Sequence, residues 1–186
     1  MSTIKVVDYD PAWPGLFERD KSRILTLIGD MVNDIHHIGS TSVVGLPAKP
    51  KIDIDAVLLS ETLVPAAVER VKSLAEFTFH GDPYGDGMWT FTSGHRSYGT
   101  RLYLCGPGNV THDNRVLFRD WLRTHPDAAA AYAALKGKLA AEADGDWKFY
   151  TGGKSDFVAR TVRQASTERV RRIALRMERA GHAAPC

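Results

Sequence analysis

A short apolar strand that carries two aspartates is the feature that most constrains this chain. Residues 52–59 alternate and are rich in β-branched side chains, which predicts a strand. Asp53 and Asp55 lie two residues apart, so their side chains project from the same face. Two neighbouring carboxylates repel each other unless a cation lies between them. Mg²⁺ prefers carboxylate and phosphate oxygens, so the pattern predicts that Asp53 and Asp55 are catalytic residues that hold a metal ion.

The segment before this strand supplies groups that suit phosphate. Residues 34–38 predict a strand, and residues 39–51 predict a loop with two glycines and two prolines. Glycine allows close backbone approach, and free amides and hydroxyls can hold phosphate oxygens. We therefore expect phosphate or substrate binding by a set of residues from this segment: His37, Gly39, Ser40, Thr41 and Lys51. Lys49 also flanks the carboxylates and is expected to act in catalysis. This arrangement is typical of metal-assisted phosphoryl or nucleotidyl transfer, although His37 would serve equally well as a buried structural imidazole.

The order of predicted elements indicates an α+β protein. Amphipathic spacing predicts helices over residues 11–30, 61–76, 113–124, 126–143 and 155–180. Besides the two strands above, strands are expected at residues 77–79, 88–92 and 101–105, the last two as an antiparallel pair around a turn. A turn-rich loop, residues 81–87, precedes this pair. The expected fold is a small mixed β-sheet flanked by helices, with a helical C-terminal portion and residues 1–186 in one domain.

The charge balance limits the classes of binding partner that are expected. The chain has 186 residues, with 24 Lys and Arg against 22 Asp and Glu, for a net charge of +2. This balance argues against a general nucleic-acid binder. Residues 155–186, however, carry seven arginines against three acidic residues. Apolar residues recur there at helical spacing, so we expect a basic amphipathic helix that packs on the body, with nucleic acid or an acidic partner as the minor alternative.

Targeting signals and cysteine frameworks are not evident in the sequence. Two cysteines, Cys105 and the terminal Cys186, do not make a disulfide framework, and we expect Cys105 to be a small buried residue. The first residues lack an apolar core, and no apolar run reaches membrane-spanning length. We therefore expect a cytoplasmic protein without a membrane association. The oligomeric state stays open, a homodimer included.

Several residues beyond the loop and strand are further candidates. Arg119 and Arg123 lie four apart on one expected helix and could clamp an anion, or they could form a solvated helix face. Lys154 follows Gly152 and Gly153 at an expected helix start, where an anion is welcome. The polar turn at residues 95–96 and the acidic loop at residues 81–87 are weaker candidates, and both are equally typical of plain turns.

The stretch HIGSTSVVGLPAKPKIDID, residues 37–55, resembles the signature of the GrpB family within the nucleotidyltransferase superfamily. The similarity extends to three further regions: residues 9–18, residues 117–126, and the Tyr150, Lys154 and Phe157 pattern. It covers about residues 4–166. The resemblance implies a palm-like sheet, a Gly-Ser loop and an Asp-x-Asp pair.

Active members of that superfamily usually add a third carboxylate on a neighbouring strand. The matching strand here is residues 100–104, which offers Arg101 and Tyr103 as substrate-binding candidates and no carboxylate. Val44 and Lys51 also depart from the family pattern. The missing third carboxylate argues against a full two-metal mechanism and leaves one metal on Asp53 and Asp55, with Asp82 or Asp86 of the acidic loop as a further candidate ligand.

Three functions follow as hypotheses. The first is Mg-dependent nucleotidyl transfer from a nucleoside triphosphate (NTP) to a small-molecule acceptor. The second is a nucleotide-binding or regulatory module without catalysis, which the missing third carboxylate favours. The third is a nucleotidyltransferase fold repurposed for non-nucleotide small-molecule chemistry in specialised metabolism, where Lys49, Arg101 and Tyr103 would matter more than a metal. All three share a small anionic or nucleotide ligand.

Overall fold

The computed structural model describes residues 4–94 and 98–181 and contains one five-stranded sheet in that part of the chain. The strand order is β1-β2-β5-β4-β3. The bounds are β1 Val32–Ile38, β2 Lys51–Leu58, β3 Thr78–Gly81, β4 Trp89–Gly94 and β5 Gly99–Cys105. Only the β2–β5 pair is parallel among these, so the sheet is mixed. The expected α+β class and the antiparallel β4–β5 pair are confirmed.

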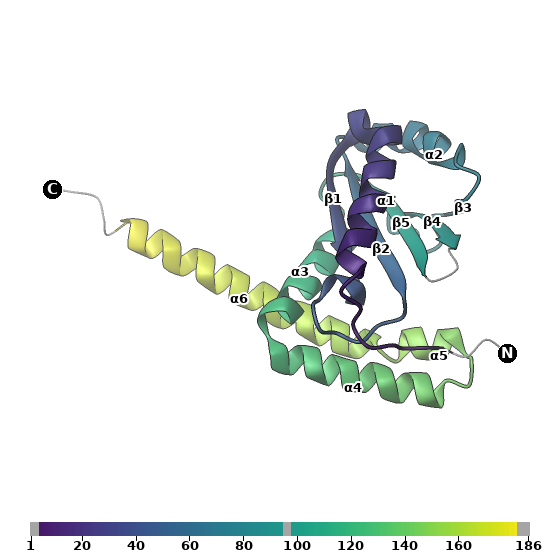
Figure 1. Ribbon diagram of the computed structural model, residues 1–186. Helices are drawn as coiled ribbons and strands as arrows, with labels where there is room; N and C mark the ends of the chain where they lie inside the picture. Colours follow the sequence, from purple (N-terminus) through teal and green to yellow (C-terminus); the bar gives the residue numbers. More distant parts are fainter. Residues whose placement is uncertain (1–3, 95–97, 182–186) are drawn as a thin grey trace.

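Two helices cover one face of the sheet. These are α1 (Trp13–Ile28) and α2 (Val64–Lys72), which lie side by side over the strands in Figure 1. Alternate residues of β2 point at them, and Ile52, Ile54 and Leu58 are fully buried in the main core. Burial of this apolar face supplies the dominant favourable term in folding. The aspartates of β2 therefore face the other way.

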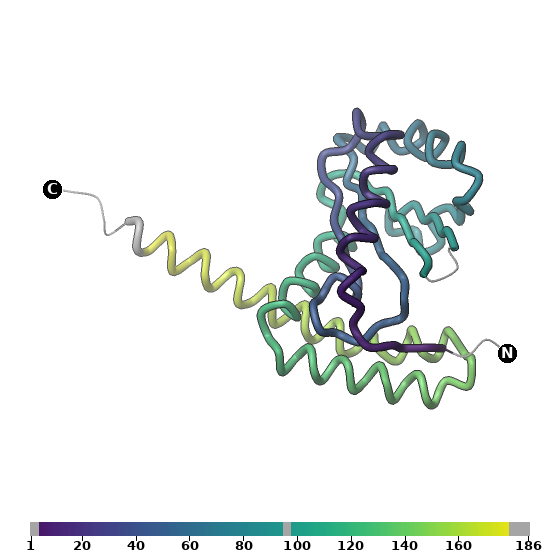
Figure 2. Tube along the Cα trace, viewed as in Figure 1, coloured from purple at the N-terminus to yellow at the C-terminus, as the bar shows by residue number. Residues whose placement is uncertain are grey.

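The remaining helices lie at the other side and at one end of the sheet. They are α3 (Val110–Thr124), α4 (Pro126–Glu142), α5 (Trp147–Gly152) and α6 (Ser155–Gly181). The chain trace shows the extended N-terminal segment running beside α5 (Figure 2), and Ile4 packs there with Leu139 and Tyr150. Within the described residues no helix is both long and apolar enough to cross a membrane.

Some element boundaries differ from the sequence expectation. The α5 helix was not expected, because two glycine-containing segments flank a stretch of only six residues; Asp146 caps it by accepting hydrogen bonds from the Lys148 and Phe149 amides. The α3 helix begins at Val110 rather than 113 because Asn109 caps its first turn. The weighed candidates at residues 95–96 lie outside the described part of the chain.

The expectation for the C-terminal helix is wrong over its second half. The first half of α6 packs against α3, and Thr161 and Ala165 are buried. From residue 169 to 178 every side chain is exposed, including Ile173 and Met177, which were expected to pack on the body. Figure 1 shows the reason: this part of the helix extends beyond the other elements into solvent.

Candidate functional site

The two aspartates lie on the polar face of the sheet, as the alternation predicts. Asp53 stands in register with Ile38 of β1 and Arg101 of β5, and Asp55 stands between His36 and Tyr103. Arg101 and Tyr103 thus occupy the positions on the neighbouring strand where active members of the nucleotidyltransferase superfamily usually carry a third carboxylate. The strand assignment is confirmed, and the two aspartates have different surroundings.

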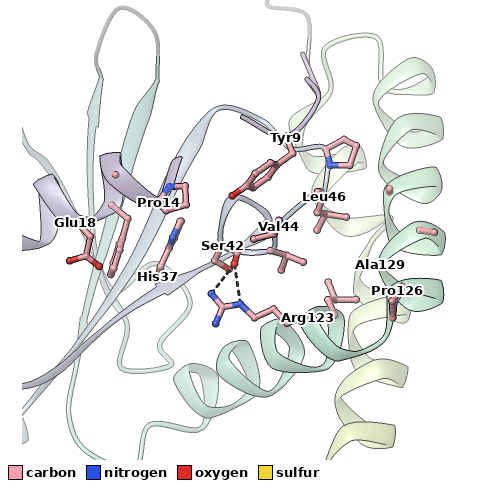
Figure 3. A pocket seen from close by; sticks show the side chains of 18 residues that line it. Tyr9, Pro14, Glu18, His37, Ser42, Val44, Leu46, Arg123, Pro126 and Ala129 are labelled. Atoms are coloured by element: carbon pink, nitrogen blue, oxygen red, sulfur yellow. Dashed lines mark hydrogen bonds between the residues drawn. The ribbon is translucent and has the colours of Figure 1, made fainter. Parts of the chain in front are cut away.

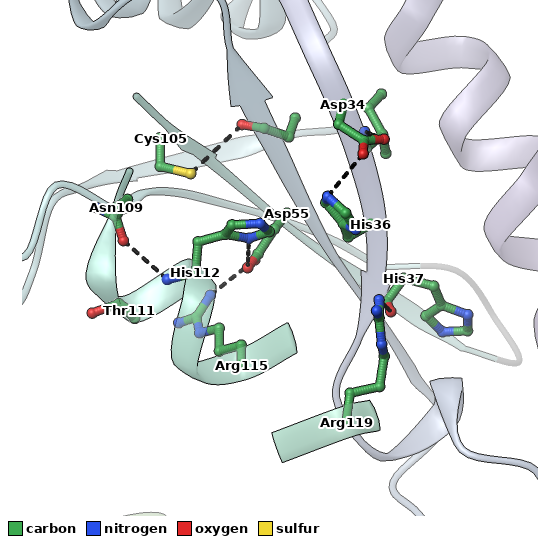
Figure 4. A network of polar contacts seen from close by, with 12 residues as sticks. Asp34, His36, His37, Asp55, Cys105, Asn109, Thr111, His112, Arg115 and Arg119 are labelled. Atoms are coloured by element: carbon green, nitrogen blue, oxygen red, sulfur yellow. Dashed lines mark hydrogen bonds and ion pairs between the residues drawn. The ribbon is translucent and has the colours of Figure 1, made fainter. Parts of the chain in front are cut away.

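Asp55 is a structural carboxylate. It is fully buried, and its Oδ2 lies 2.9 Å from His112 Nδ1 while its Oδ1 accepts a hydrogen bond of 3.0 Å from Arg115. Figure 4 shows the side chains of His112 and Arg115 pointing from α3 toward Asp55. A buried charge needs such compensation, since an unpaired one costs several kcal/mol. Both oxygens of Asp55 are therefore engaged within the protein, and a metal ion shared by Asp53 and Asp55 stays a prediction.

The Asp55 pair continues into a wider network. The His112 ring lies 4.8 Å from the ring of His36, centroid to centroid, and His36 Nε2 lies 3.2 Å from Asp34 Oδ2. Desolvation lowers the pKa of His36 below its usual value. Cys105 is buried next to this network, and burial raises the pKa of its thiol to about 12. The cysteine is therefore a buried thiol of low reactivity, as expected.

Asp53 has no hydrogen-bond partner among the described residues and is half-buried. Burial raises the pKa of its carboxyl group, against the pull of the cations around it. Gly39 approaches it closely: a methyl group on Gly39 would lie 2.6 Å from Asp53 Oδ2. Gly39 also has φ +72° and ψ −175°, a region that is open essentially to glycine alone. The Gly-Ser loop therefore contacts Asp53 through a backbone that only glycine fits.

Four cations from separate segments converge on Asp53. They are Lys49 in the loop, Lys51 at the start of β2, Arg101 on β5 and Lys154 before α6, and each has an electrostatic interaction with Asp53. Arg115 also acts on Asp53, although its charge is paired with Asp55. Positive charge around Asp53 therefore exceeds the negative charge that faces it, and the term cationic cleft below means Asp53 and these four cations with the space among them.

The lysines around Asp53 have lowered pKa values, because they are partly buried and lie near other cations. Desolvation and the neighbouring Lys154 charge lower the pKa of Lys49 to about 8. Desolvation also lowers the pKa values of Lys51 and Lys154. Both Lys49 and Lys154 lie over the ring of Tyr150, at 4.9 and 4.3 Å from its centroid, an arrangement that stabilises cations without neutralising them. An anion that entered the cleft would relieve the mutual repulsion.

The fit to a divalent cation is partial. Asp53 offers the kind of oxygen that Mg²⁺ prefers, but within residues 4–94 and 98–181 no three His, Cys, Asp or Glu side chains are grouped to hold a metal ion. In the acidic loop, Asp82 accepts the amides of Asp86 and Gly87, and Asp86 Oδ2 accepts the Thr111 hydroxyl while its Oδ1 is buried without a partner among the described residues.

Two of the residues expected to bind phosphate, His37 and Thr41, form hydrogen bonds that support the Gly-Ser loop. The Thr41 hydroxyl donates to the Lys51 carbonyl, 3.0 Å away, and therefore accepts from His37 Nε2, also at 3.0 Å. His37 is stacked on Phe17, and desolvation lowers its pKa to about 4. His37 is thus the buried structural imidazole that was the alternative, and Thr41 is turned inward.

The two arginines of α3 bind backbone carbonyls. Arg119 donates to the His37 carbonyl at 3.0 Å, and Arg123 donates to the Ser42 carbonyl through Nε and Nη2, at 3.0 and 2.8 Å. Arg119 therefore binds a backbone carbonyl of β1 and Arg123 binds one of the loop, whereas the expected anion clamp stays a prediction. The two contacts fix β1 and the loop to α3.

Lys136 is a loop contact that sequence reasoning did not single out. It is 2% exposed on α4, and its ammonium donates to Ser40 Oγ at 3.0 Å and to the Pro47 carbonyl. Desolvation and the charges of Lys154 and Lys49 lower its pKa to about 7. A sequence pattern could have predicted that Lys136 is buried. It lies four residues after Tyr132, so both side chains share one face of an alanine-rich helix. His112 and Arg115 gave no comparable signal, because their partner Asp55 is distant in sequence.

A cavity of about 840 Å³ lies on the reverse side of this loop. Figure 3 shows it between α1, the loop and the α3–α4 corner, with Arg123 bonded to Ser42 at its wall. Its lining is mainly apolar, from Phe17, Leu46 and three alanines of α4. The charged groups around Asp53 do not line it, so the candidate site is the cationic cleft.

Comparison with known proteins agrees with this architecture. A solved structure of the conserved protein GrpB from Enterococcus faecalis superposes with a TM-score of 0.80 at 24% identity, covering 88% of this chain and 98% of that one. A structure of the GLD-2/RNP-8 complex superposes with a TM-score of 0.56 at 8% identity, covering 77% and 58%. The fold is therefore nucleotidyltransferase-like.

The family assignment follows from sequence comparison. The family model "GrpB protein" matches residues 3–164, and the chain belongs to the GrpB family. The UPF0157 protein YqkA of Bacillus subtilis (strain 168) is 32% identical over 155 residues, which is 83% of this chain. The chain spans only 45% of the length of that relative.

Proposed function

We propose that this protein binds an NTP, with the polyphosphate in the cationic cleft around Asp53. One observation carries the proposal: Lys49, Lys51, Arg101 and Lys154 face a single unpaired carboxylate. The positions of these groups on four different segments suit an extended anion better than a single phosphate. Lys and Arg are the usual partners of phosphate oxygens.

The nucleotidyltransferase-like fold and the Gly-Ser loop support a nucleotide as the source of that polyphosphate. Ser40 begins the short 3₁₀ turn after Gly39, with its hydroxyl held by Lys136. Asp53 would hold a divalent ion that enters with the phosphates, and that ion would offset phosphate charge and polarise a phosphoryl oxygen. A metal ion alone is expected to bind poorly, because it would enter a cleft that is already positive.

Nucleotidyl transfer is the second candidate, and the unpaired state of Asp53 favours it. In such a step an acceptor oxygen forms a bond to the α-phosphorus, the α–β anhydride bond breaks, pyrophosphate leaves and the acceptor proton passes to solvent. Only Asp53 of the expected catalytic carboxylates remains available, since Asp55 is committed to His112 and Arg115. Binding without turnover is therefore the function that the geometry supports best.

Calorimetric titration of the full chain with the four NTPs and with inorganic tripolyphosphate, all with Mg²⁺, tests the proposal. We expect saturable binding, and about tenfold weaker binding in Lys49→Met and in Lys154→Met, because each loses a charge-assisted contact. Lys138→Met is the matched control, since that lysine is exposed on α4. Absence of binding by every NTP, or equal loss in the control, would refute the proposal.

A parallel assay of pyrophosphate release separates the two candidates. Release that depends on Mg²⁺ and is lost in Asp53→Asn would establish transfer. NTP binding without pyrophosphate release would establish a nucleotide-binding module without catalysis. Activity on a non-nucleotide substrate that persists in excess chelator would instead favour the repurposed fold.

A further inference from the structure

A second cavity adjoins the cationic cleft. Its volume is about 540 Å³, and it is lined by residues of α3, α4, α5 and the start of α6. Lys154 lines this cavity and also interacts with Asp53. Lys154 therefore belongs both to the lining of this cavity and to the cations around Asp53, so a ligand with phosphates near Asp53 could extend past Lys154 into the cavity.

The lining of this cavity differs in character from the cleft. Its apolar part is Val158, Ala159 and Val162, three residues that recur along one side of α6. Its polar part is Asn114, Thr151 and Ser155. These three polar side chains are exposed, so their hydrogen-bonding groups are accessible to a ligand. Lys154 is the one charged residue in the lining.

This combination suits a nucleoside. An aliphatic surface packs against the flat face of a base, while an amide offers both a donor and an acceptor to its edge. Hydroxyl groups of threonine and serine suit the hydroxyls of a ribose. A second polyphosphate or a metal ion would leave the apolar half of the cavity unused. The larger cavity behind the loop lacks this connection to the charged cleft.

We propose that the cavity between α3 and α6 is the nucleoside subsite, with Asn114 contacting the base and the α6 surface packing against its face. The proposal rests on the proposed function, because it takes the polyphosphate to lie around Asp53. It adds that the affinity for an NTP exceeds the affinity for tripolyphosphate, and that the excess arises from this cavity. It also makes Asn114 the residue that discriminates among bases.

A filled cavity provides the test. Ala159 is exposed on α6 and lines the cavity, so Ala159→Trp occupies the space without disturbing buried packing. We expect it to weaken binding of the best NTP about tenfold or more while leaving tripolyphosphate binding unchanged. Gln164→Trp adds the same bulk on another side of α6, and we expect it to alter neither titration.

Asn114→Leu tests the assignment of the base contact. We expect about threefold to tenfold weaker binding of the preferred NTP, a smaller spread of affinity among the four NTPs, and unchanged tripolyphosphate binding. Equal affinity of the wild-type chain for NTPs and tripolyphosphate would overturn the subsite and leave the phosphate site standing. Equal loss for both ligands in Ala159→Trp would also overturn it.

Discussion

At the scale of single residues, Gly39 connects the loop to the candidate site. Its backbone conformation is one that a side chain rarely adopts, and an added methyl group would meet Asp53 Oδ2 at 2.6 Å. We expect Gly39→Ala to lower the free energy of unfolding by about 1–3 kcal/mol and to weaken NTP binding. Urea denaturation measures the first effect. Gly137→Ala is the control, since open space surrounds that glycine; a loss as large there would contradict the explanation.

The lowered pKa of Lys136 predicts how the free energy of unfolding depends on pH. Its pKa falls from an ordinary value of 10.5 to about 7 on folding, so between these values the unfolded chain binds more protons than the folded one. The linkage relation then requires stability to rise with pH over that window. We expect the unfolding free energy to rise from pH 7 to pH 9.5 by more in the wild type than in Lys136→Met. Lys49 contributes in the same direction in both proteins, and equal slopes would contradict the assignment.

At the scale of elements, the polar contacts tie α3 to the sheet and to the loop. Asp55 of β2 binds His112 and Arg115 of α3, and Arg123 of α3 binds the Ser42 carbonyl. The sheet thus presents one aspartate to its own helix and leaves the other open to the cleft. The two aspartates of the Asp-x-Asp pattern therefore have different roles: Asp55 binds α3, and Asp53 faces the cations.

This difference predicts unequal effects on stability. We expect Asp55→Asn to lower the unfolding free energy by about 3 kcal/mol, because it breaks a buried ion pair and leaves Arg115 uncompensated. We expect Asp53→Asn to lower it by less than Asp55→Asn does, because Asp53 is half-buried and has no hydrogen bond to lose, so only its attraction to the surrounding cations is removed. Thermal unfolding of the two variants compares them, and a larger loss at Asp53 would reverse the roles proposed here.

The sequence was informative about local patterns and uninformative about partners that are distant along the chain. Alternation in β2 correctly placed Asp53 and Asp55 on one face, and helical spacing placed most helices. The partners of Asp55 belong to a helix 57 and 60 residues away, and no local pattern encodes such a contact. Arg119 and Arg123 share a helix face as expected, but whether that face meets a ligand or a backbone carbonyl depends on packing.

At the scale of the whole molecule, the positive charge is divided between two parts of the fold. The excess of arginines belongs to α6, whose second half carries its side chains in solvent. The cations of the cleft belong to the body. Figure 1 shows the second half of α6 extending away from the other elements, so its arginines and the cations around Asp53 belong to different parts of the fold.

The exposed half of α6 predicts tolerance to truncation. We expect a chain that ends at Glu168 to keep its melting temperature within about 2 °C of the wild type and to bind NTPs with unchanged affinity. The physical reason is that residues 169–178 bury no side chain against the body. A large fall in melting temperature, measured by circular dichroism, would show that these residues support the fold.

The central claim is that Asp53 is an unpaired carboxylate inside a phosphate-binding cleft. Titration of wild type and Asp53→Asn with the same NTP, once with Mg²⁺ and once with excess chelator, tests it most directly, with exposed Asp127→Asn as control. Without the metal, the substitution removes a repulsion and is expected to strengthen binding about threefold to tenfold; with the metal, it removes a ligand and is expected to weaken binding by a similar factor. A change of the same sign in both titrations, or none in either, would contradict the account.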